Sequence, residues 1–169
     1  LPSTTAGSLL AFGNGRSYSD VCLNPDNSLL ETRHLDRFIQ FDTQAGTLRC
    51  EAGLLLGELL AVTVPQGWFL PVLPGTRYAT VGGAIANDVH GKNHCQAGSF
   101  GHHVRALSLR RSDGEVQQLQ PGYERFTASI GGLGLTGLIT AAELGLRRVA
   151  GPMLEEHAEV FGNLDEGLA

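Results

Sequence analysis

The sequence predicts an α+β fold of two interlocked subdomains, one made of short strands with helices and the other mostly of antiparallel strands. Two apolar runs, 38–42 and 47–52, flank the tetrapeptide Thr-Gln-Ala-Gly, which is typical of a hairpin. Residues 54–64 have the length and the apolar spacing of a helix. Two further runs, 104–111 and 115–119, flank Ser-Asp-Gly-Glu, which favours a second pair of antiparallel strands.

Turn and capping residues predict the other elements. A glycine-rich loop is expected at 12–20. The helix at 54–64 should stop at Pro65 and Gly67, because these residues are typical of helix ends. The apolar run 68–73 should then be buried and extended.

The segment 80–88 begins with Thr80 in a capping position and continues with small residues, which predicts a short helix that approaches a neighbour closely. In the second half, Pro121 should open a short helix over 121–130. Alternation predicts a strand over 138–147.

Composition and charge exclude several classes of protein. The chain has 169 residues, a net charge of -5, and basic residues that are scattered along it, so a nucleic-acid surface is not expected. No apolar run is long enough to span a bilayer. The 3 cysteines are far apart and form no Cys-x-x-Cys motif, which argues against a disulfide framework and a zinc ribbon.

Three glycine clusters, at 13–15, 82–83 and 131–137, indicate an anion-binding backbone. Glycine has no Cβ, so several backbone N–H groups can converge on one diphosphate. Residues 132–137 match G-x-G-x-x-G, but they follow a helix-like segment and open a strand, so a Rossmann site is rejected. A P-loop also fails, because Asn93 stands where Ser or Thr is needed and Ala86 where the first Gly is needed.

The segment 88–100, DVHGKNHCQAGSF, contains the only lysine of the chain, Lys92. We expect Lys92 to face an anionic or electron-rich ligand, and His90 to move a proton or orient a substrate oxygen. Arg16 has two open interpretations, a surface group or a group that neutralises phosphate. The His and Cys residues of this region lack the spacing of a metal-binding motif, so we expect no metal site. We expect the histidines to hydrogen-bond the backbone of the loop instead. The residues of this group are His90, His94, Cys95, His102 and His103.

Three segments together resemble the PCMH-type FAD-binding domain of the vanillyl-alcohol-oxidase flavoprotein family. They are 13–20 (GNGRSYSD), 74–104 (PGTRYATVGGAIANDVHGKNHCQAGSFGHHV) and 131–139 (GGLGLTGLI). Within that family they are similar to the decaprenylphosphoryl-β-D-ribose 2-oxidase-like group. The resemblance implies an FAD-binding domain over 1–148, shortened at its N-terminus, and the start of a substrate-binding domain over 149–169.

The resemblance also implies roles for single residues. The loop around the FAD diphosphate would consist of Asn14, Gly15, Arg16, Ser17 and Tyr18. The cofactor channel would be lined by Pro74, Gly75, Thr76, Thr80, Val81, Gly82, Gly83, Ala84 and Ile85. The edge of the isoalloxazine, at the boundary with substrate, would meet His90, Gly91, Lys92 and Asn93, and the adenine and ribose side would meet Gly137 and Ile139.

The activity implied by the resemblance is oxidation of a CH–OH group of a sugar or polyol, with hydride passing to flavin N5 and with His90 and Lys92 as the catalytic groups. The first glycine loop contains no His, so FAD is expected to be bound non-covalently; a cysteinyl link through Cys95 is the exception. Two alternatives stay open: a chain that holds FAD but is inactive alone, or a flavin reductase of a nucleotide-sugar alkene. Neither the electron acceptor nor the compartment follows from the sequence.

Overall fold

A five-stranded antiparallel sheet of order β3-β4-β8-β6-β7 forms the centre of the protein. The computed structural model describes residues 7–168. Its strands are β1 (Leu9–Phe12), β2 (Ser28–Glu31), β3 (Phe38–Asp42), β4 (Thr47–Glu51), β5 (Trp68–Phe69), β6 (Val104–Arg110), β7 (Val116–Leu119), β8 (Leu138–Gly145) and β9 (Arg147–Arg148). Its α-helices are α1 (Leu56–Thr63), α2 (Val81–Ala86), α3 (His94–Ala97), α4 (Glu124–Ser129) and α5 (Leu164–Leu168), and short 3-10 helices cover Val64–Gln66 and Phe100–His103.

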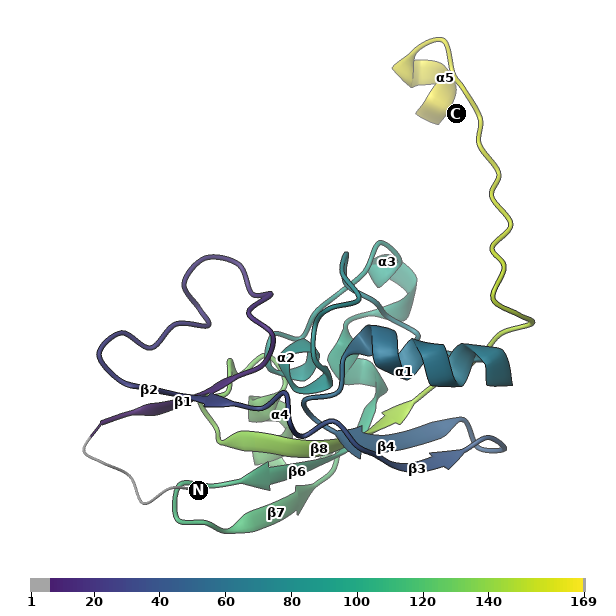
Figure 1. Ribbon diagram of the computed structural model, residues 1–169. Coiled ribbons are helices and arrows are strands. Elements are labelled where there is room, and N and C mark those ends of the chain that lie inside the picture. Colours follow the sequence, from purple (N-terminus) through teal and green to yellow (C-terminus); the bar gives the residue numbers. More distant parts are fainter. Residues whose placement is uncertain (1–6, 169) are drawn as a thin grey trace.

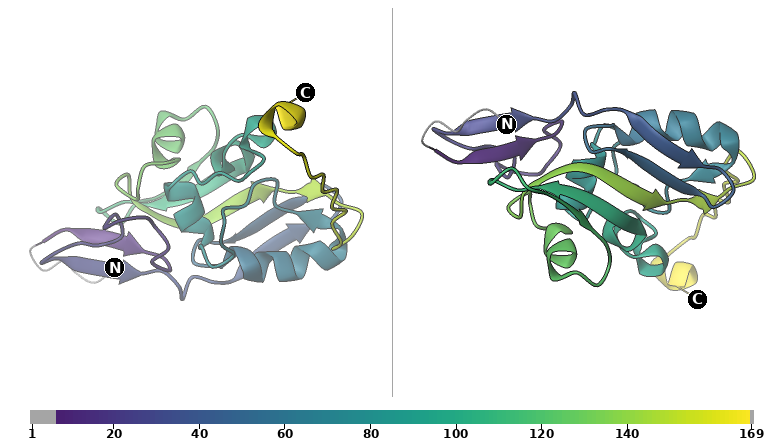
Figure 2. Two further views of the ribbon diagram at one scale, coloured as in Figure 1. Left: turned by 90° about the horizontal axis from the view of Figure 1, so that it is seen from above. Right: turned by 90° about the horizontal axis from the view of Figure 1, so that it is seen from below.

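The two halves of the chain interlock through this sheet, as the α+β prediction expected. The hairpin β3–β4 belongs to the first half, and β8, from the end of the chain, pairs with β4 on one side and with β6 on the other. Helices α1 and α2 lie over one face of the sheet (Figures 1 and 2). Completely buried side chains from both halves fill the space between them, among them Leu48, Leu59 and Leu107.

A separate pair of strands was not predicted. Strands β1 and β2 are parallel and form a small sheet of their own beside the end of the main sheet (Figures 1 and 2). The run Leu9–Phe12, directly before the glycine loop, is apolar and has the composition of a buried strand, so β1 could have been predicted from it. Because β1 leads directly into residues 13–18, it fixes where the glycine loop begins.

The two predicted hairpins, the helix after Leu55 and the short helix after Thr80 are confirmed, with three boundary corrections. Helix α4 begins at Glu124 and not at Pro121, since residues 121–123 form the turn that precedes it. Pro65 lies inside the 3-10 turn that extends α1, and Gly67 ends that turn with φ 80°. The run 68–73 forms a regular strand only at Trp68–Phe69, although Leu70 and Val72 are buried as expected.

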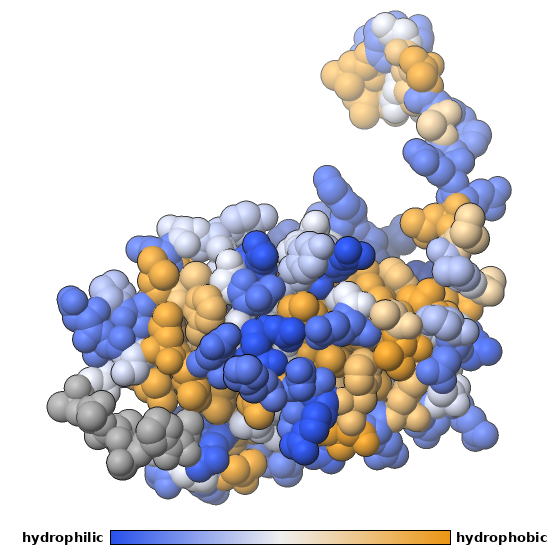
Figure 3. Space-filling view, in the orientation of Figure 1, coloured by the Kyte–Doolittle hydropathy of each residue, from blue (hydrophilic) through white to orange (hydrophobic). Residues whose placement is uncertain are grey.

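After β9, which pairs with β5, the chain extends away from the body toward α5 (Figure 1). Its apolar side chains face solvent, as Figure 3 shows for the upper part of the molecule; Met153, Leu154 and Leu164 are all exposed. That 149–169 opens a further domain stays a prediction, and residues 1–6 and 169 lie outside the described range. Within residues 7–168, no helix combines the length and the apolar character that crossing a membrane requires.

Candidate cofactor site

The predicted glycine segments meet around one cavity of about 730 Å³. The loop after β1, the segment 74–76, the first turn of α2 and the loop 131–137 before β8 form its walls. Fourteen of the residues expected to contact FAD are among the lining residues: Asn14, Gly15, Arg16, Ser17, Tyr18, Pro74, Gly75, Thr76, Thr80, Gly82, Gly83, His90, Gly137 and Ile139. Segments that are far apart in the sequence therefore share one site.

The charge of the cavity differs in sign from that of the whole chain. Arg16 is the one Arg or Lys among the described lining residues, and those residues include no Asp or Glu. The chain as a whole carries a net charge of -5. A cavity without carboxylates and with one guanidinium is suited to an anionic ligand.

Helix α2 presents one face to the cavity and the other to the core. Gly82 and Gly83 line the cavity, whereas Val81, Ala84 and Ile85 have no exposed surface and belong to the core. Positions three and four apart share a face of a helix, so these three side chains cannot line the channel that was expected of them. They instead anchor the helix whose glycines form the wall.

Glycine at position 82 allows α2 to lie directly on the end of β4. The Gly82 N–H donates to the Ala52 carbonyl at 2.7 Å, and a Cβ at residue 82 would lie 3.0 Å from the Ala52 Cβ. The Thr80 hydroxyl accepts from the Gly83 N–H at 3.0 Å and so caps the helix, as the sequence predicted. The wall is thus fixed by backbone contacts rather than by long side chains.

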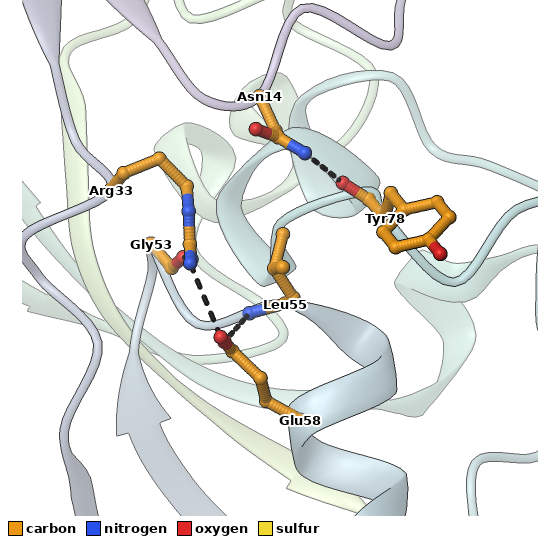
Figure 4. A network of polar contacts seen from close by, with 6 residues as sticks. All are labelled: Asn14, Arg33, Gly53, Leu55, Glu58 and Tyr78. Atoms are coloured by element: carbon orange, nitrogen blue, oxygen red, sulfur yellow. Dashed lines mark hydrogen bonds and ion pairs between the residues drawn. The ribbon is translucent and has the colours of Figure 1, made fainter.

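The first glycine loop is tied to the segment 77–80 across the cavity. A Cβ at Gly13 would lie 2.6 Å from the Thr80 Oγ1, so only glycine permits this approach. The Asn14 side-chain amide donates to the Tyr78 carbonyl at 2.8 Å (Figure 4). Gly15 has φ 58°, a conformation that glycine adopts without steric cost.

A second network lies beside this connection, at the start of α1 (Figure 4). The Glu58 carboxylate accepts from the Leu55 N–H at 2.8 Å and from the Arg33 guanidinium at 3.2 Å. Arg33 also donates to the Gly53 carbonyl. These bonds connect the turn after β4 to the segment that follows β2, and both border the cavity through Ala52 and Thr32.

The loop 131–137 closes the cavity on the side of α2. The Gly131 N–H donates to the Ile85 carbonyl at 3.0 Å, and the Leu133 N–H donates to the Ala86 carbonyl at 2.8 Å. Gly137 has φ 147°, and a Cβ there would lie 2.8 Å from the Arg110 carbonyl oxygen. The third glycine cluster therefore brings the start of β8 close to β6 and to the cavity.

The segment 90–93 lies only partly at the cavity. His90 lines it and is exposed, whereas Gly91, Lys92 and Asn93 are not among the lining residues. Asn93 donates to the Pro71 carbonyl at 2.9 Å, and a Cβ at Gly91 would lie 2.6 Å from the Leu73 carbonyl oxygen. Lys92 is exposed beside this packed turn.

The other histidines of the segment hydrogen-bond the local loop, as expected. His94 Nδ1 lies 3.3 Å from the Gly91 carbonyl, and His103 Nε2 lies 2.9 Å from the Ala97 carbonyl. His102 Nδ1 accepts from the Ser99 N–H at 3.2 Å. Within residues 7–168, no group of three or more His, Cys, Asp or Glu side chains is placed to hold a metal ion.

Several lining residues were missed from the sequence. Some come from β1 and from the segment between β1 and β2, and others follow α2 or precede β8; they include Leu10, Ala11, Val21, Cys22, Asn87, Val89, Leu133 and Gly134. Of the cysteines, Cys22 lines the cavity and Cys95 does not; burial raises the pKa of the third, Cys50, to about 12. The parallel pairing of β1 with β2 determines this part of the wall, and local sequence patterns did not reveal it.

Comparison with known proteins agrees with this geometry. Residues 4–120 match the family described as FAD binding domain. The chain is 40% identical over 164 residues to decaprenylphosphoryl-beta-D-ribose oxidase of Mycolicibacterium smegmatis, covering 95% of the chain and 36% of that protein. It is 31% identical over 151 residues to alditol oxidase of a Streptomyces species, covering 89% of the chain and 35% of that protein.

A solved structure shares the fold. Alkyldihydroxyacetonephosphate synthase superposes with a TM-score of 0.72 at 18% identity, covering 84% of this chain and 28% of that one. The chain thus spans about a third of the length of the curated relatives described above, 36% and 35% of each.

FAD fits the residues that are present. Its diphosphate needs several backbone donors and a positive charge, and the cavity has three glycine segments around Arg16 with no carboxylate among its described lining residues. The chain therefore belongs to the FAD binding domain family of FAD-linked oxidoreductases, of the PCMH and vanillyl-alcohol-oxidase type, and FAD is its cofactor.

Proposed function

We propose that this chain holds FAD non-covalently within an oxidoreductase that oxidises a CH–OH group of a sugar or polyol derivative. The observation that carries the proposal is the cavity whose described lining residues include Arg16 and no carboxylate, with glycines where a Cβ would collide. The names of two relatives, a ribose derivative oxidase and an alditol oxidase, support the substrate class.

The proposed arrangement places the diphosphate at the first glycine loop. Backbone N–H groups of 14–18 and the Arg16 guanidinium would hold its negative charge. The walls at Gly137 and Ile139 would face the adenine and ribose, and the walls at Gly82 and Gly83 would let the flavin lie against backbone. FAD, when bound, supplies the hydride acceptor at flavin N5.

His90 and Lys92 would act at the boundary between flavin and substrate. His90 lines the cavity and is exposed, so its imidazole can hold the proton that leaves the substrate hydroxyl. Lys92 is exposed two residues away, and its ammonium can donate hydrogen bonds to a substrate oxygen. The rest of the substrate cavity is not assigned to this chain.

Non-covalent binding is supported by the composition of the loop. Residues 13–18 contain no His or Cys, and Cys95 lies outside the cavity wall. Cys22 and His90 do line the cavity, so a covalent bond between flavin and either side chain would contradict this part of the proposal.

Flavin release is the first test. The absorbance spectrum of the purified protein is recorded before and after acid precipitation. Flavin that moves to the supernatant supports non-covalent FAD. Flavin that stays in the pellet contradicts it, and peptide mapping would then identify the attached residue.

Turnover is the second test, with the full-length protein and an artificial electron acceptor. Oxidation of sugars or alditols supports the proposed substrate class. Consumption of NADPH with a nucleotide-sugar alkene, and no alcohol oxidation, would favour the reductase alternative instead.

A further inference from the structure

The ring of Tyr78 lies close to two arginines at the edge of the cavity. The Arg16 guanidinium carbon is 5.7 Å from the centre of its ring, and the Arg77 guanidinium carbon is 5.3 Å from it. Arg77 also donates to the Tyr78 hydroxyl at 3.3 Å. Cations at such distances from an aromatic ring are attracted to its π-system. Of these three residues, Arg16 alone lines the cavity.

Arg77 is itself fixed by α1. Its carbonyl accepts from the Gly57 N–H at 2.9 Å. Its aliphatic stem packs over Gly57 so closely that a Cβ at residue 57 would lie 3.3 Å from three of its carbons. Helix α1 therefore restrains the backbone and the aliphatic stem of Arg77, and with them the position of its guanidinium.

The Tyr78 backbone is fixed independently of its ring. Its carbonyl accepts from Asn14 at 2.8 Å, and its N–H donates to the Thr76 hydroxyl at 3.2 Å. Removing the ring would leave both bonds in place. The ring is thus available for a separate role, which can be tested without moving the glycine loop.

The described residues offer Arg16 and Arg77 no carboxylate partner, since the ion pairs found in residues 7–168 join Arg33 to Glu58, Arg37 to Glu51 and His157 to Glu159. The Arg77 hydrogen bond, its charge and, less strongly, the charge of Arg16 lower the pKa of the exposed Tyr78 hydroxyl. Two like charges therefore share one ring at the edge of a cavity that contains no carboxylate among its described lining residues.

We propose that Tyr78 is a positioning residue for the cofactor: its ring, held by Arg77, keeps the Arg16 guanidinium at the cavity wall, where it meets the FAD diphosphate. This inference rests on the proposed placement of the diphosphate at the first glycine loop. Tyr78 does not line the cavity, so it acts through Arg16 and not by direct contact.

The experiment compares FAD with riboflavin, which has no phosphate, as ligands of the apoprotein of the full-length enzyme. Tyr78→Leu removes the ring, Tyr78→Phe keeps the ring and removes the hydroxyl, and Arg16→Gln removes the charge. Tyr123→Leu is the matched control, because Tyr123 is also exposed and lies outside the cavity. Flavin binding is followed by fluorescence quenching at two salt concentrations, and thermal unfolding of each apoprotein reports on folding.

Loss of the ring should raise the Kd of FAD about threefold, as expected for an exposed cation–π contact. The Kd of riboflavin should not change, and the salt dependence of FAD binding should become weaker. Tyr78→Phe should lie between wild type and Tyr78→Leu. In the Arg16→Gln background Tyr78→Leu should have no further effect, because the ring acts through that guanidinium.

Three results would overturn the inference: an unchanged FAD Kd in Tyr78→Leu, an equal loss for FAD and riboflavin, or full additivity with Arg16→Gln. An equal loss for both ligands would mean that Tyr78 only maintains the fold. A wild-type apoprotein that binds neither FAD nor riboflavin would instead contradict the proposed function. This outcome differs from the three above, because it is seen without any substitution.

Discussion

Gly13 and Thr80 are so close that a Cβ at residue 13 would lie 2.6 Å from the Thr80 Oγ1. The same oxygen accepts the Gly83 N–H and caps α2. The glycine loop, the helix cap and the cavity wall therefore depend on one contact. Any side chain at position 13 must move either the loop or the cap.

Gly13→Ala should weaken FAD binding by about an order of magnitude, because overpacking at a rigid contact commonly costs 1–3 kcal/mol. Flavin fluorescence titration of the apoprotein measures the change. Gly151→Ala is the control, since no atom lies within 4 Å of a Cβ there and Gly151 is outside the cavity. Equal Kd values for the two variants would show that the loop adjusts without cost.

His90→Gln should lower kcat of the full-length enzyme by about 100-fold, in the range of a lost general base, with less than a twofold change in FAD affinity. His102→Gln is the control, because His102 hydrogen-bonds Ser99 and does not line the cavity. Similar kcat losses in both variants would point to a structural role of the loop.

Lys92→Met should raise KM for the alcohol about tenfold, as expected for a lost charge-assisted hydrogen bond, and leave the flavin spectrum unchanged. Steady-state kinetics with an artificial acceptor and flavin titration separate the two effects. An unaltered KM would remove Lys92 from the substrate boundary.

Gly46→Ala should destabilise the fold at a position outside the cofactor cavity. A Cβ there would lie 2.1 Å from the ring of Trp68, and the residue has φ 66°. We expect a loss of about 2–4 kcal/mol, from the left-handed backbone and from displacement of the ring. Gly114→Ala has φ 89° and open space, so it isolates the backbone cost of about 1 kcal/mol. Denaturant unfolding followed by the fluorescence of the single Trp measures the free energy of unfolding of both variants. Equal losses in the two variants would mean that the Trp68 ring moves aside without cost.

The ion pair of Arg37 and Glu51 should make stability depend on pH. Hydrogen bonding from the Arg37 guanidinium, at 2.7 Å, lowers the pKa of the buried Glu51 carboxyl. Because the folded pKa lies below the unfolded one, this stabilisation is complete above the unfolded pKa, about 4.3, and is lost as pH falls through the folded pKa.

Arg37→Gln should therefore unfold at a lower denaturant concentration than wild type at pH 7, and the difference should shrink as pH falls below the unfolded pKa and disappear once the Glu51 carboxyl is protonated in the folded state. Arg49→Gln is a suitable control, because no ion pair of Arg49 is found within residues 7–168. A difference between Arg37→Gln and wild type that does not depend on pH would indicate lost packing of the arginine stem.

Local signals predicted much of the fold. The hairpin turns at 43–46 and 112–115 and the Thr80 cap each act within a few residues, so the sequence alone revealed them. The parallel pair β1–β2 and the position of β8 depend on contacts between distant segments, and no local pattern encodes these.

The candidate site shows the same division. Five glycines predicted from the resemblance line the cavity, namely Gly15, Gly75, Gly82, Gly83 and Gly137, whereas Gly91 does not. Of these, Gly82 and Gly137 lie where a Cβ would be within 3.0 Å of a neighbouring segment. Ala84 and Ile85 were expected there and instead lie in the core, since the direction in which α2 faces is set by Ala52 and the sheet beneath it. The pairing of Tyr78 with Arg16, 62 positions away, requires the tertiary structure.

The central position of β8 has a consequence for synthesis. Its partners β4 and β6 are both translated earlier, and it lies between them in the finished sheet. A nascent chain that ends before Leu138 can form the hairpins β3–β4 and β6–β7 but lacks the strand that joins them. The apolar faces of both hairpins are then exposed to water or bound by a chaperone. Long-range pairing of this kind folds slowly, and the interval before β8 emerges from the ribosome is when this domain is most prone to aggregate.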